Sequence, residues 1–132
     1  MDEQTTEMIR TAMPFTAALG IGVVSASPDE VVASAGWAED RTTSGGLIHG
    51  GYLMAVADSV GALLAVLNLP AGATTATIES KTNFVRAVRS GVVTARATPV
   101  HVGSRTIVVQ TDMTRDDGEL VSRTTQTQAV IS

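Results

Sequence analysis

One acidic residue stands alone in a long apolar run, and it is the first candidate for chemistry. Residues 45–69 contain a single formally charged side chain, Asp58, among Leu, Val, Ala and Gly. An unpaired buried carboxylate is costly, so this pattern indicates a carboxylate with a task. The plainer alternative is a carboxylate at the rim of the core, bonded to backbone or water.

Two glycine pairs flank His49 at the start of the same run. Glycine permits a sharp turn there and lets another molecule approach the backbone closely. If a helix begins here, the first-turn amides of Gly50, Gly51 and Tyr52 lack intrahelical acceptors and lie at the positive end of the helix dipole. Such amides suit a carbonyl oxygen that becomes an oxyanion. Taken alone, the glycines would indicate only a tight loop.

The element that must position these groups is one long helix. From about residue 48 to 67 the run holds good helix formers and no proline, which predicts about 20 helical residues over about 30 Å. It is apolar on every side, so it belongs in a membrane or in an enclosing core. A charge at mid-span costs about 2.5–3.5 kcal/mol in a membrane, and no Lys or Arg cluster flanks the segment. We therefore expect no membrane span and a helix wrapped by a sheet.

The spacing within this helix predicts a second chain. Eight residues separate Asp58 from Gly50 by about 12 Å along the axis, which is too far for both to act on one carbonyl. Two such helices packed antiparallel about a two-fold axis would bring the amides of one chain to the carboxylate of the other. The face of Asp58 carries mostly small residues against which a thin ligand could lie: Met54, Ala55, Gly61 and Ala62.

The rest of the chain predicts an α+β domain with an antiparallel sheet of five or six strands around the helix. We expect a short helix over 2–12, stopped by Pro14, and strands over 19–27, 31–37, 74–88, 92–102, 105–114 and 119–131. Hairpin-like breaks at 89–91, 103–104 and 116–118 make the last four strands a meander. One sheet covers one side of the helix, so its other side again calls for a partner subunit.

Composition limits the classes of function. The length of 132 residues fits one domain spanning 1–132, and the absence of cysteine excludes disulfides and thiol chemistry. The N-terminus does not resemble a signal peptide, so we expect a cytoplasmic protein. A net charge of −4 and 3% aromatic residues argue against nucleic acid. Eight of the nine basic residues are Arg, which binds phosphate bidentately.

The motifs together resemble a known family. The chain is similar to the hotdog-fold acyl-CoA thioesterases of the phenylacetate-pathway type, which are also similar to 4-hydroxybenzoyl-CoA thioesterases. The resemblance covers about residues 15–131. It rests on Gly46-Leu47-Ile48-His49-Gly50-Gly51, on Asp58 nine residues after the His, on Asn83-Phe84-Val85-Arg86 and on Val100-His101-Val102-Gly103-Ser104-Arg105.

The resemblance implies hydrolysis of an aryl or medium-chain acyl-CoA thioester to free acid and CoA. Asp58 would act as general base or nucleophile, the amide of Gly50 or Gly51 would polarise the thioester carbonyl, and His49 would orient the site. Coenzyme A is part of the substrate, and no other cofactor and no metal is expected. We expect this chain to form a homodimer at least, and a dimer of dimers as its full assembly.

The chain departs from the family pattern in two places. Many relatives carry an Asn shortly before the His, where this chain has residues 40–44, Asp-Arg-Thr-Thr-Ser. Many also carry a hydroxyl one or two turns after the carboxylate, where Ala62 and Ala65 stand. A water-positioning hydroxyl must then come from elsewhere, and Thr75 or Thr77 at the start of the next strand is the candidate.

The phosphates of CoA need cations on an otherwise acidic protein. The turn of Gly103, Ser104 and Arg105 offers amides, a hydroxyl and a guanidinium, and we expect Arg86 on a neighbouring strand to add a second guanidinium. Asn83 is grouped with them as a substrate-binding residue. Two other functions stay open: a hotdog dehydratase or hydratase, which also uses a His and a carboxylate, and a non-catalytic acyl-CoA or lipid binder.

Overall fold

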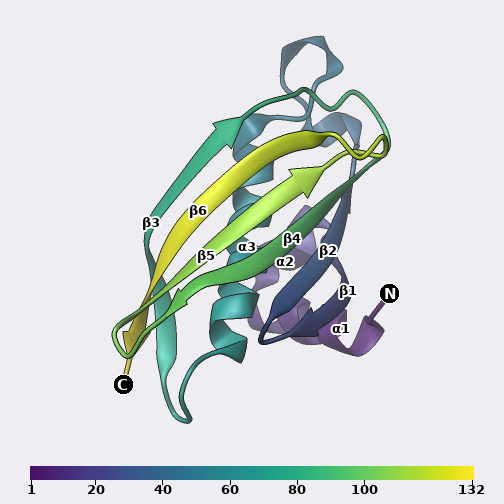
Figure 1. Ribbon diagram of the computed structural model, residues 1–132. Helices are drawn as coiled ribbons and strands as arrows, with labels where there is room; N and C mark the ends of the chain where they lie inside the picture. The colour runs from purple at the N-terminus through teal and green to yellow at the C-terminus, as the bar shows by residue number, and fades with distance from the viewer.

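The computed structural model describes residues 1–132 as an antiparallel sheet of six strands curved around one long helix (Figure 1). The expected α+β class is confirmed. The helices are α1 (Glu3–Ala12), α2 (Pro14–Leu19) and α3 (Gly50–Leu67), and two short 3-10 turns cover Glu39–Arg41 and Ser44–Gly46. The strands are β1 (Gly22–Ser27), β2 (Glu30–Gly36), β3 (Thr74–Phe84), β4 (Val92–Val102), β5 (Thr106–Thr114) and β6 (Leu120–Ile131).

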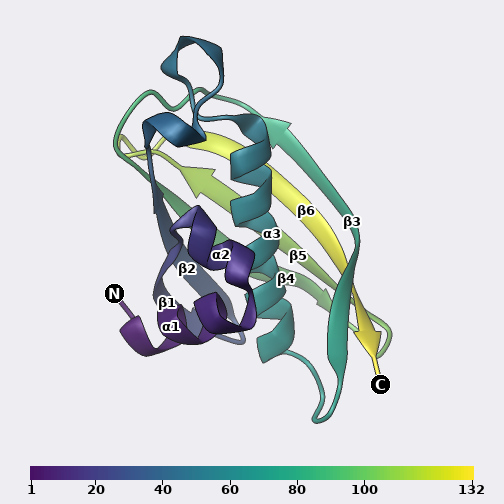
Figure 2. The ribbon, with the colours of Figure 1, turned by 180° about the vertical axis from the view of Figure 1, so that it is seen from behind.

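The N-terminal segment contains one helix more than the sequence predicted. Pro14 does not only end the first helix; it begins α2, where its missing N–H is no loss. Because α2 runs to Leu19, the first strand begins at Gly22 and not at residue 19. In Figure 2, α2 lies beside α3 on the side of β1 and β2. The expectation that the chain leaves the helix bare on the side away from the sheet is therefore wrong in part, because α2 covers some of that side.

Two side-chain contacts join α2 to α3. The hydroxyl of Thr16 donates to that of Ser59 at 2.9 Å, with both residues buried, and the Tyr52 hydroxyl donates to the Leu19 carbonyl at 2.6 Å. Burial raises the pKa of the Tyr52 hydroxyl, while the Arg41 guanidinium, 5.1 Å from the ring centroid, opposes that shift. These bonds anchor the first turn of α3 and its middle to the N-terminal segment.

The predicted four-strand meander is wrong. The strand order is β1-β2-β4-β5-β6-β3, so β3 lies at the edge beside β6 and not next to β4. The strand predicted to reach residue 88 ends at Phe84, and residues 85–91 form a crossover past one end of the sheet, not a hairpin. Its backbone groups pair with other elements: Val85 N–H donates to Val121, and the Val88 carbonyl accepts from Ile48.

The helix α3 is the centre of the core. By length and by its mean hydropathy of 1.7 it could cross a membrane, but half of its 18 residues are buried inside the domain. Its inward positions pack in one hydrophobic cluster with the sheet. A stripe stays exposed on the remaining face: Gly51, Asp58 and Val66.

Candidate active site

The carboxylate of Asp58 is exposed on the open stripe of α3 and is held by one of its two oxygens. Oδ1 accepts a hydrogen bond from Thr77 Oγ1 at 3.0 Å and another from Gln126 Nε2 at 3.1 Å. Oδ2 accepts no hydrogen bond from the chain. The carboxylate is thus fixed on one side and available to a second molecule on the other.

The structure distinguishes the two candidate hydroxyls on β3. Thr77 contacts Asp58, whereas Thr75 donates to the Ala129 carbonyl at 2.7 Å and accepts from Gln128. A β-bulge between Thr77 and Glu79 interrupts the pairing with β6 next to this contact. Bulges re-aim side chains next to functional sites, and this one lies beside the residue that meets the carboxylate.

Gln126 is the site residue that sequence reasoning missed. It lies on β6, is fully buried, and reaches Asp58 from beneath the helix. A signal was present, because Gln126 and Gln128 are two positions apart and therefore share one face of a strand. Thr at many neighbouring positions made both faces of this strand look half-polar and hid which face is inward. The helix face predicted room for a ligand at the small residue Gly61. That prediction is wrong at this position, because the Gln126 side chain fills the space.

The start of α3 is capped by His49. Its Nδ1 accepts from the Gly51 amide at 2.8 Å, and its carbonyl accepts from Tyr52 and Leu53 at 3.0 and 3.3 Å. The Gly51 amide, one of the predicted oxyanion donors, is therefore already occupied. The Gly50 amide has no acceptor within the chain and is the remaining donor of the first turn.

A groove of about 320 Å³ opens at this helix start. Phe84 lies over Gly50, where an added Cβ would meet the ring at 3.0 Å. The lining is largely apolar and comes from the loop before α3, from its first turn and from the crossover: Thr43, Leu47, Ile48, Gly50, Leu53, Phe84, Val85, Arg86, Ala87 and Val88. The unpaired Gly50 amide thus borders an apolar groove.

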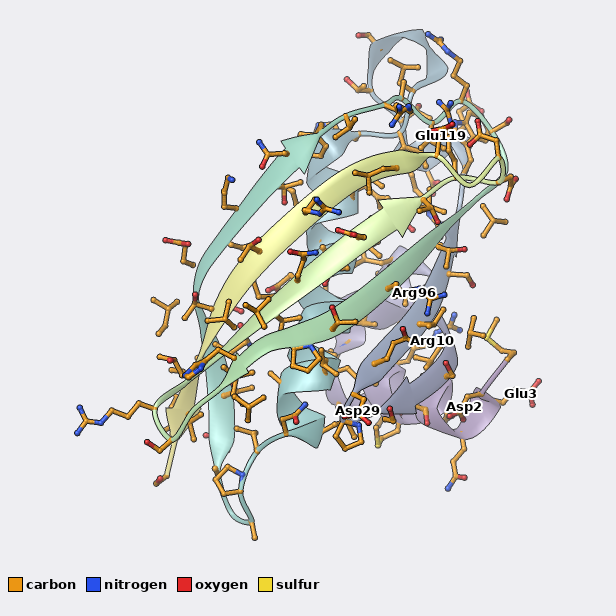
Figure 3. The ribbon with its side chains drawn as sticks, viewed as in Figure 1. Asp2, Glu3, Arg10, Asp29, Arg96 and Glu119 are labelled. Atoms are coloured by element: carbon orange, nitrogen blue, oxygen red, sulfur yellow. The ribbon has the colours of Figure 1, made fainter.

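A second pocket of about 590 Å³ adjoins the groove, and we call it the arginine pocket. Arg86 and Ala87 line both, and the rest of the lining is polar: Arg89, Ser90, Arg115, Asp116 and Asp117. Arg115 forms a bidentate bond with Asp117, which raises the pKa of Arg115. Arg86 pairs with Glu119 at 3.4 Å, at the end of the sheet where Figure 3 labels Glu119. Arg89 makes no ion pair within the chain.

The turn of Gly103, Ser104 and Arg105 lies at the other end of the sheet. The Arg105 carbonyl accepts from Val130, whereas the Arg86 amide donates to Val121, nine positions away along β6. That separation is about 30 Å in an extended strand. The prediction that Arg86 supports Arg105 at one phosphate is therefore wrong within a single chain.

The remaining predicted residues make few side-chain contacts. Asn83 is exposed on β3 opposite Arg123, which is itself paired with Asp112 at 2.7 Å. Gly103 N–H donates to the Thr106 carbonyl at 2.9 Å and closes the β4–β5 turn. No three His, Asp or Glu side chains gather where they could hold a metal ion.

Comparison with known proteins identifies relatives of this site and fold. A model of the thioesterase superfamily matches residues 45–122, which include the helix start, Asp58 and Arg86. A Haemophilus influenzae protein provisionally named an esterase is 38% identical over 87 residues, 66% of this chain and 63% of the relative. The 1,4-dihydroxy-2-naphthoyl-CoA hydrolase of Escherichia coli is 31% identical over 86 residues, 65% of this chain and 63% of that enzyme.

Solved structures of similar fold superpose on more of this chain than the sequence relatives match. A thioesterase from Haemophilus influenzae has a TM-score of 0.91 at 30% identity and covers 100% of this chain and 91% of its own. A thioesterase from Pseudomonas aeruginosa has a TM-score of 0.89 at 27% identity and covers 96% and 93%. In sequence, this chain spans 63%, 54% and 57% of the lengths of the first three curated relatives.

Proposed function

This chain belongs to the thioesterase superfamily and has its hotdog fold, and from that premise we propose that it hydrolyses acyl-CoA thioesters. The observation that carries the proposal is the pair of groups left unsatisfied on α3. The Gly50 amide is a free donor at the positive end of the helix, and Asp58 Oδ2 is a free acceptor on the open stripe. A hydrolase needs both, one for the oxyanion and one for the attacking water.

We call the Gly50 amide with its groove the helix-start half-site, and Asp58 with Thr77 and Gln126 the carboxylate half-site. They lie about 12 Å apart along one helix, so one chain does not bring both to the same carbonyl. We propose that a second copy of this chain supplies the missing half. Two features support a second copy as the occupant of the open stripe: β3 ends the sheet with one unpaired edge, and Ile78 on it is 62% exposed.

In the proposed reaction, Asp58 of one copy takes a proton from a water molecule. The water oxygen bonds to the thioester carbon, and the carbonyl oxygen becomes an oxyanion that accepts from the Gly50 amide of the other copy. When the carbonyl re-forms, the carbon–sulfur bond breaks and CoA leaves as a thiolate, which takes up a proton. Attack by Asp58 itself, through a mixed anhydride that water then cleaves, uses the same two groups.

The arginine pocket supports coenzyme A as the leaving group. It adjoins the groove at Gly50, so a pantetheine arm in the groove would lead to phosphates beside Arg89. On a chain of net charge −4, Arg89 is a guanidinium without an ion-pair partner next to the candidate site. For the acyl group we propose an aryl or medium-chain substrate, because the similar enzyme of Escherichia coli is named for an aryl-CoA.

The test of the reaction is thiol release from a panel of aryl-CoA and alkyl-CoA thioesters, with Asp58→Asn as the matched control. We expect catalytic turnover by the wild type, with aryl or medium-chain esters preferred, and almost none by the variant. Stoichiometric binding without turnover would contradict hydrolysis and favour an acyl-CoA binder. Addition of water to an enoyl-CoA without thiol release would favour a hydratase.

The test of the phosphate site compares Arg89→Ala with Arg105→Ala. Because phosphate contacts are remote from the reacting carbonyl, losing one should raise KM several-fold with little change in kcat. We expect this for Arg89→Ala on CoA esters and not on pantetheine esters, which lack those phosphates. If only Arg105→Ala shows this effect, the phosphates bind at the β4–β5 turn and not at Arg89.

A further inference from the structure

Burial of the Gln126 amide costs free energy that an apolar side chain packed at the same position would not cost. Gln126 and Gln128 are both buried on the face of β6 beneath α3, with exposed fractions of 0% and 1%. Burying a primary amide costs free energy unless its polar atoms find partners. Gln126 Nε2 has partners, in Asp58 Oδ1 at 3.1 Å and Gln128 Oε1 at 3.3 Å, but Gln126 Oε1 has none.

The charge on Asp58 fixes which way this amide points. An ionised carboxylate only accepts hydrogen bonds, so Gln126 must present its NH2 group to Asp58. That orientation directs Oε1 toward Gly61, where no donor is available. A buried oxygen without a donor calls for an explanation, and contact with a working carboxylate provides one.

Gly61 is the position on α3 that admits this arrangement. A Cβ at residue 61 would lie 2.7 Å from the Gln126 side-chain carbon and still closer to Oε1. Glycine in a helix interior lowers helix stability relative to alanine, so its presence there is a second local cost that serves the same contact. Gln128 Oε1 accepts from Gln126 Nε2 at 3.3 Å, but Gln128 does not contact Asp58, and its own Nε2 donates to Thr75 at 3.4 Å.

We infer that Gln126 is a positioning residue for the proposed thioester hydrolysis: together with Thr77 it holds Asp58 Oδ1, which leaves Oδ2 as the reacting oxygen. The inference rests on the proposed role of Asp58 and extends it to a residue that does not touch the substrate. Gln126 acts on the rate because a carboxylate free to rotate spends less time in the reactive geometry.

The experiment compares Gln126→Met with Gln128→Met in thiol release from an acyl-CoA. Both replace a buried amide on the same strand face by an apolar side chain of similar length, but only Gln126 contacts Asp58. We expect Gln126→Met to lower kcat by about tenfold, as for loss of one hydrogen bond to a charged group, with KM unchanged. Gln128→Met should keep kcat within about twofold, since it removes no contact with Asp58. The thermal unfolding temperatures of the two variants should change by similar amounts.

Two further variants keep the test decisive. Gly61→Ala leaves Gln126 chemically intact but displaces its amide, so it should lower kcat in the same way even if Gln126→Met does not fold. In an Asp58→Asn background, Gln126→Met should cause no further loss, because the two residues act through one group. Equal kcat losses in Gln126→Met and Gln128→Met, or a further loss in the Asp58→Asn background, would overturn the inference.

The outcomes also separate this inference from the proposed function. If Asp58→Asn is inactive while Gln126→Met and Gly61→Ala keep full kcat, only the positioning role is rejected. If Asp58→Asn keeps full kcat, the role of Asp58 is rejected and the inference with it.

Discussion

The start and the middle of α3 carry the two proposed half-sites, and they are built in different ways. At the start, the proposed working group is a backbone amide whose geometry is set locally, since His49 caps the helix and satisfies the neighbouring Gly51 amide; only the wall of its groove comes from the crossover. In the middle, the proposed working group is the Asp58 side chain. It is held by Thr77 of β3 and Gln126 of β6, which follow it in the sequence by 19 and 68 positions. The amide of the first half-site depends on local chain geometry, whereas the carboxylate of the second depends on the packing of the whole domain.

The largest loss of activity should follow removal of the carboxylate. Asp58→Asn keeps the size of the side chain but removes its basicity, and we expect kcat to fall by about 10²–10⁴-fold, as for loss of a general base. The measurement is steady-state thiol release, with thermal unfolding as the control for folding. A variant with unchanged turnover and unchanged stability would leave Asp58 as a residue at the rim of the core.

Removing the amide at the other end should cost nearly as much. Proline is favoured at the first position of a helix and His49 already has extended backbone angles, so Gly50→Pro should leave α3 formed while it deletes the N–H. Because proline also adds atoms against Phe84, Gly50→Ala is the matched control: it adds a Cβ there but keeps the N–H. We expect kcat to fall by about 10²–10³-fold, as for loss of an oxyanion-hole donor. The helical circular dichroism signal should be unchanged, and a fully active Gly50→Pro variant would exclude this amide.

A smaller effect separates the two threonines of β3. Thr77→Val removes one of the two donors to Asp58 Oδ1, and we expect a decrease in kcat of about three- to tenfold. Thr75→Val is the matched control on the same strand, two residues away, and should keep kcat because Thr75 bonds Ala129 instead. The reverse order of effects would mean that the carboxylate is positioned differently during the reaction.

The smallest predicted effect concerns the anchor of the helix start. Tyr52→Phe removes the bond to the Leu19 carbonyl and should lower the free energy of unfolding by about 1 kcal/mol at pH 7. Because burial raises the pKa of Tyr52, this stabilisation is fully present below its ordinary value of about 10 and is lost as pH rises through the raised value. Chemical denaturation of both proteins at pH 7 and above pH 10 checks this: the difference should shrink at high pH, and an unchanged difference would contradict the sign.

Local sequence was enough to predict the helix start and most strand positions, because each depends on nearby residues. The predictions that failed depend on contacts distant in sequence. The crossover at 85–91 looked like a hairpin in composition, but its backbone groups are satisfied by Ile48 and Val121. Gln126 meets Asp58 only after β6 is placed beneath α3, so spacing along the chain did not indicate it. For the same reason the sequence wrongly placed Arg86 beside Arg105, whose backbone groups bond to opposite ends of β6.

Complementation between the two inactive variants shows whether two chains share each site. Asp58→Asn retains a complete helix-start half-site, and Gly50→Pro retains a complete carboxylate half-site. If each site joins half-sites from two chains, a mixed dimer contains one intact site, and thiol release should recover to about half of the wild-type activity per mixed dimer. Mixed dimers are isolated by two different affinity tags, so their formation is established separately. Isolated mixed dimers as inactive as either parent, or a fully active monomer, would contradict the shared site.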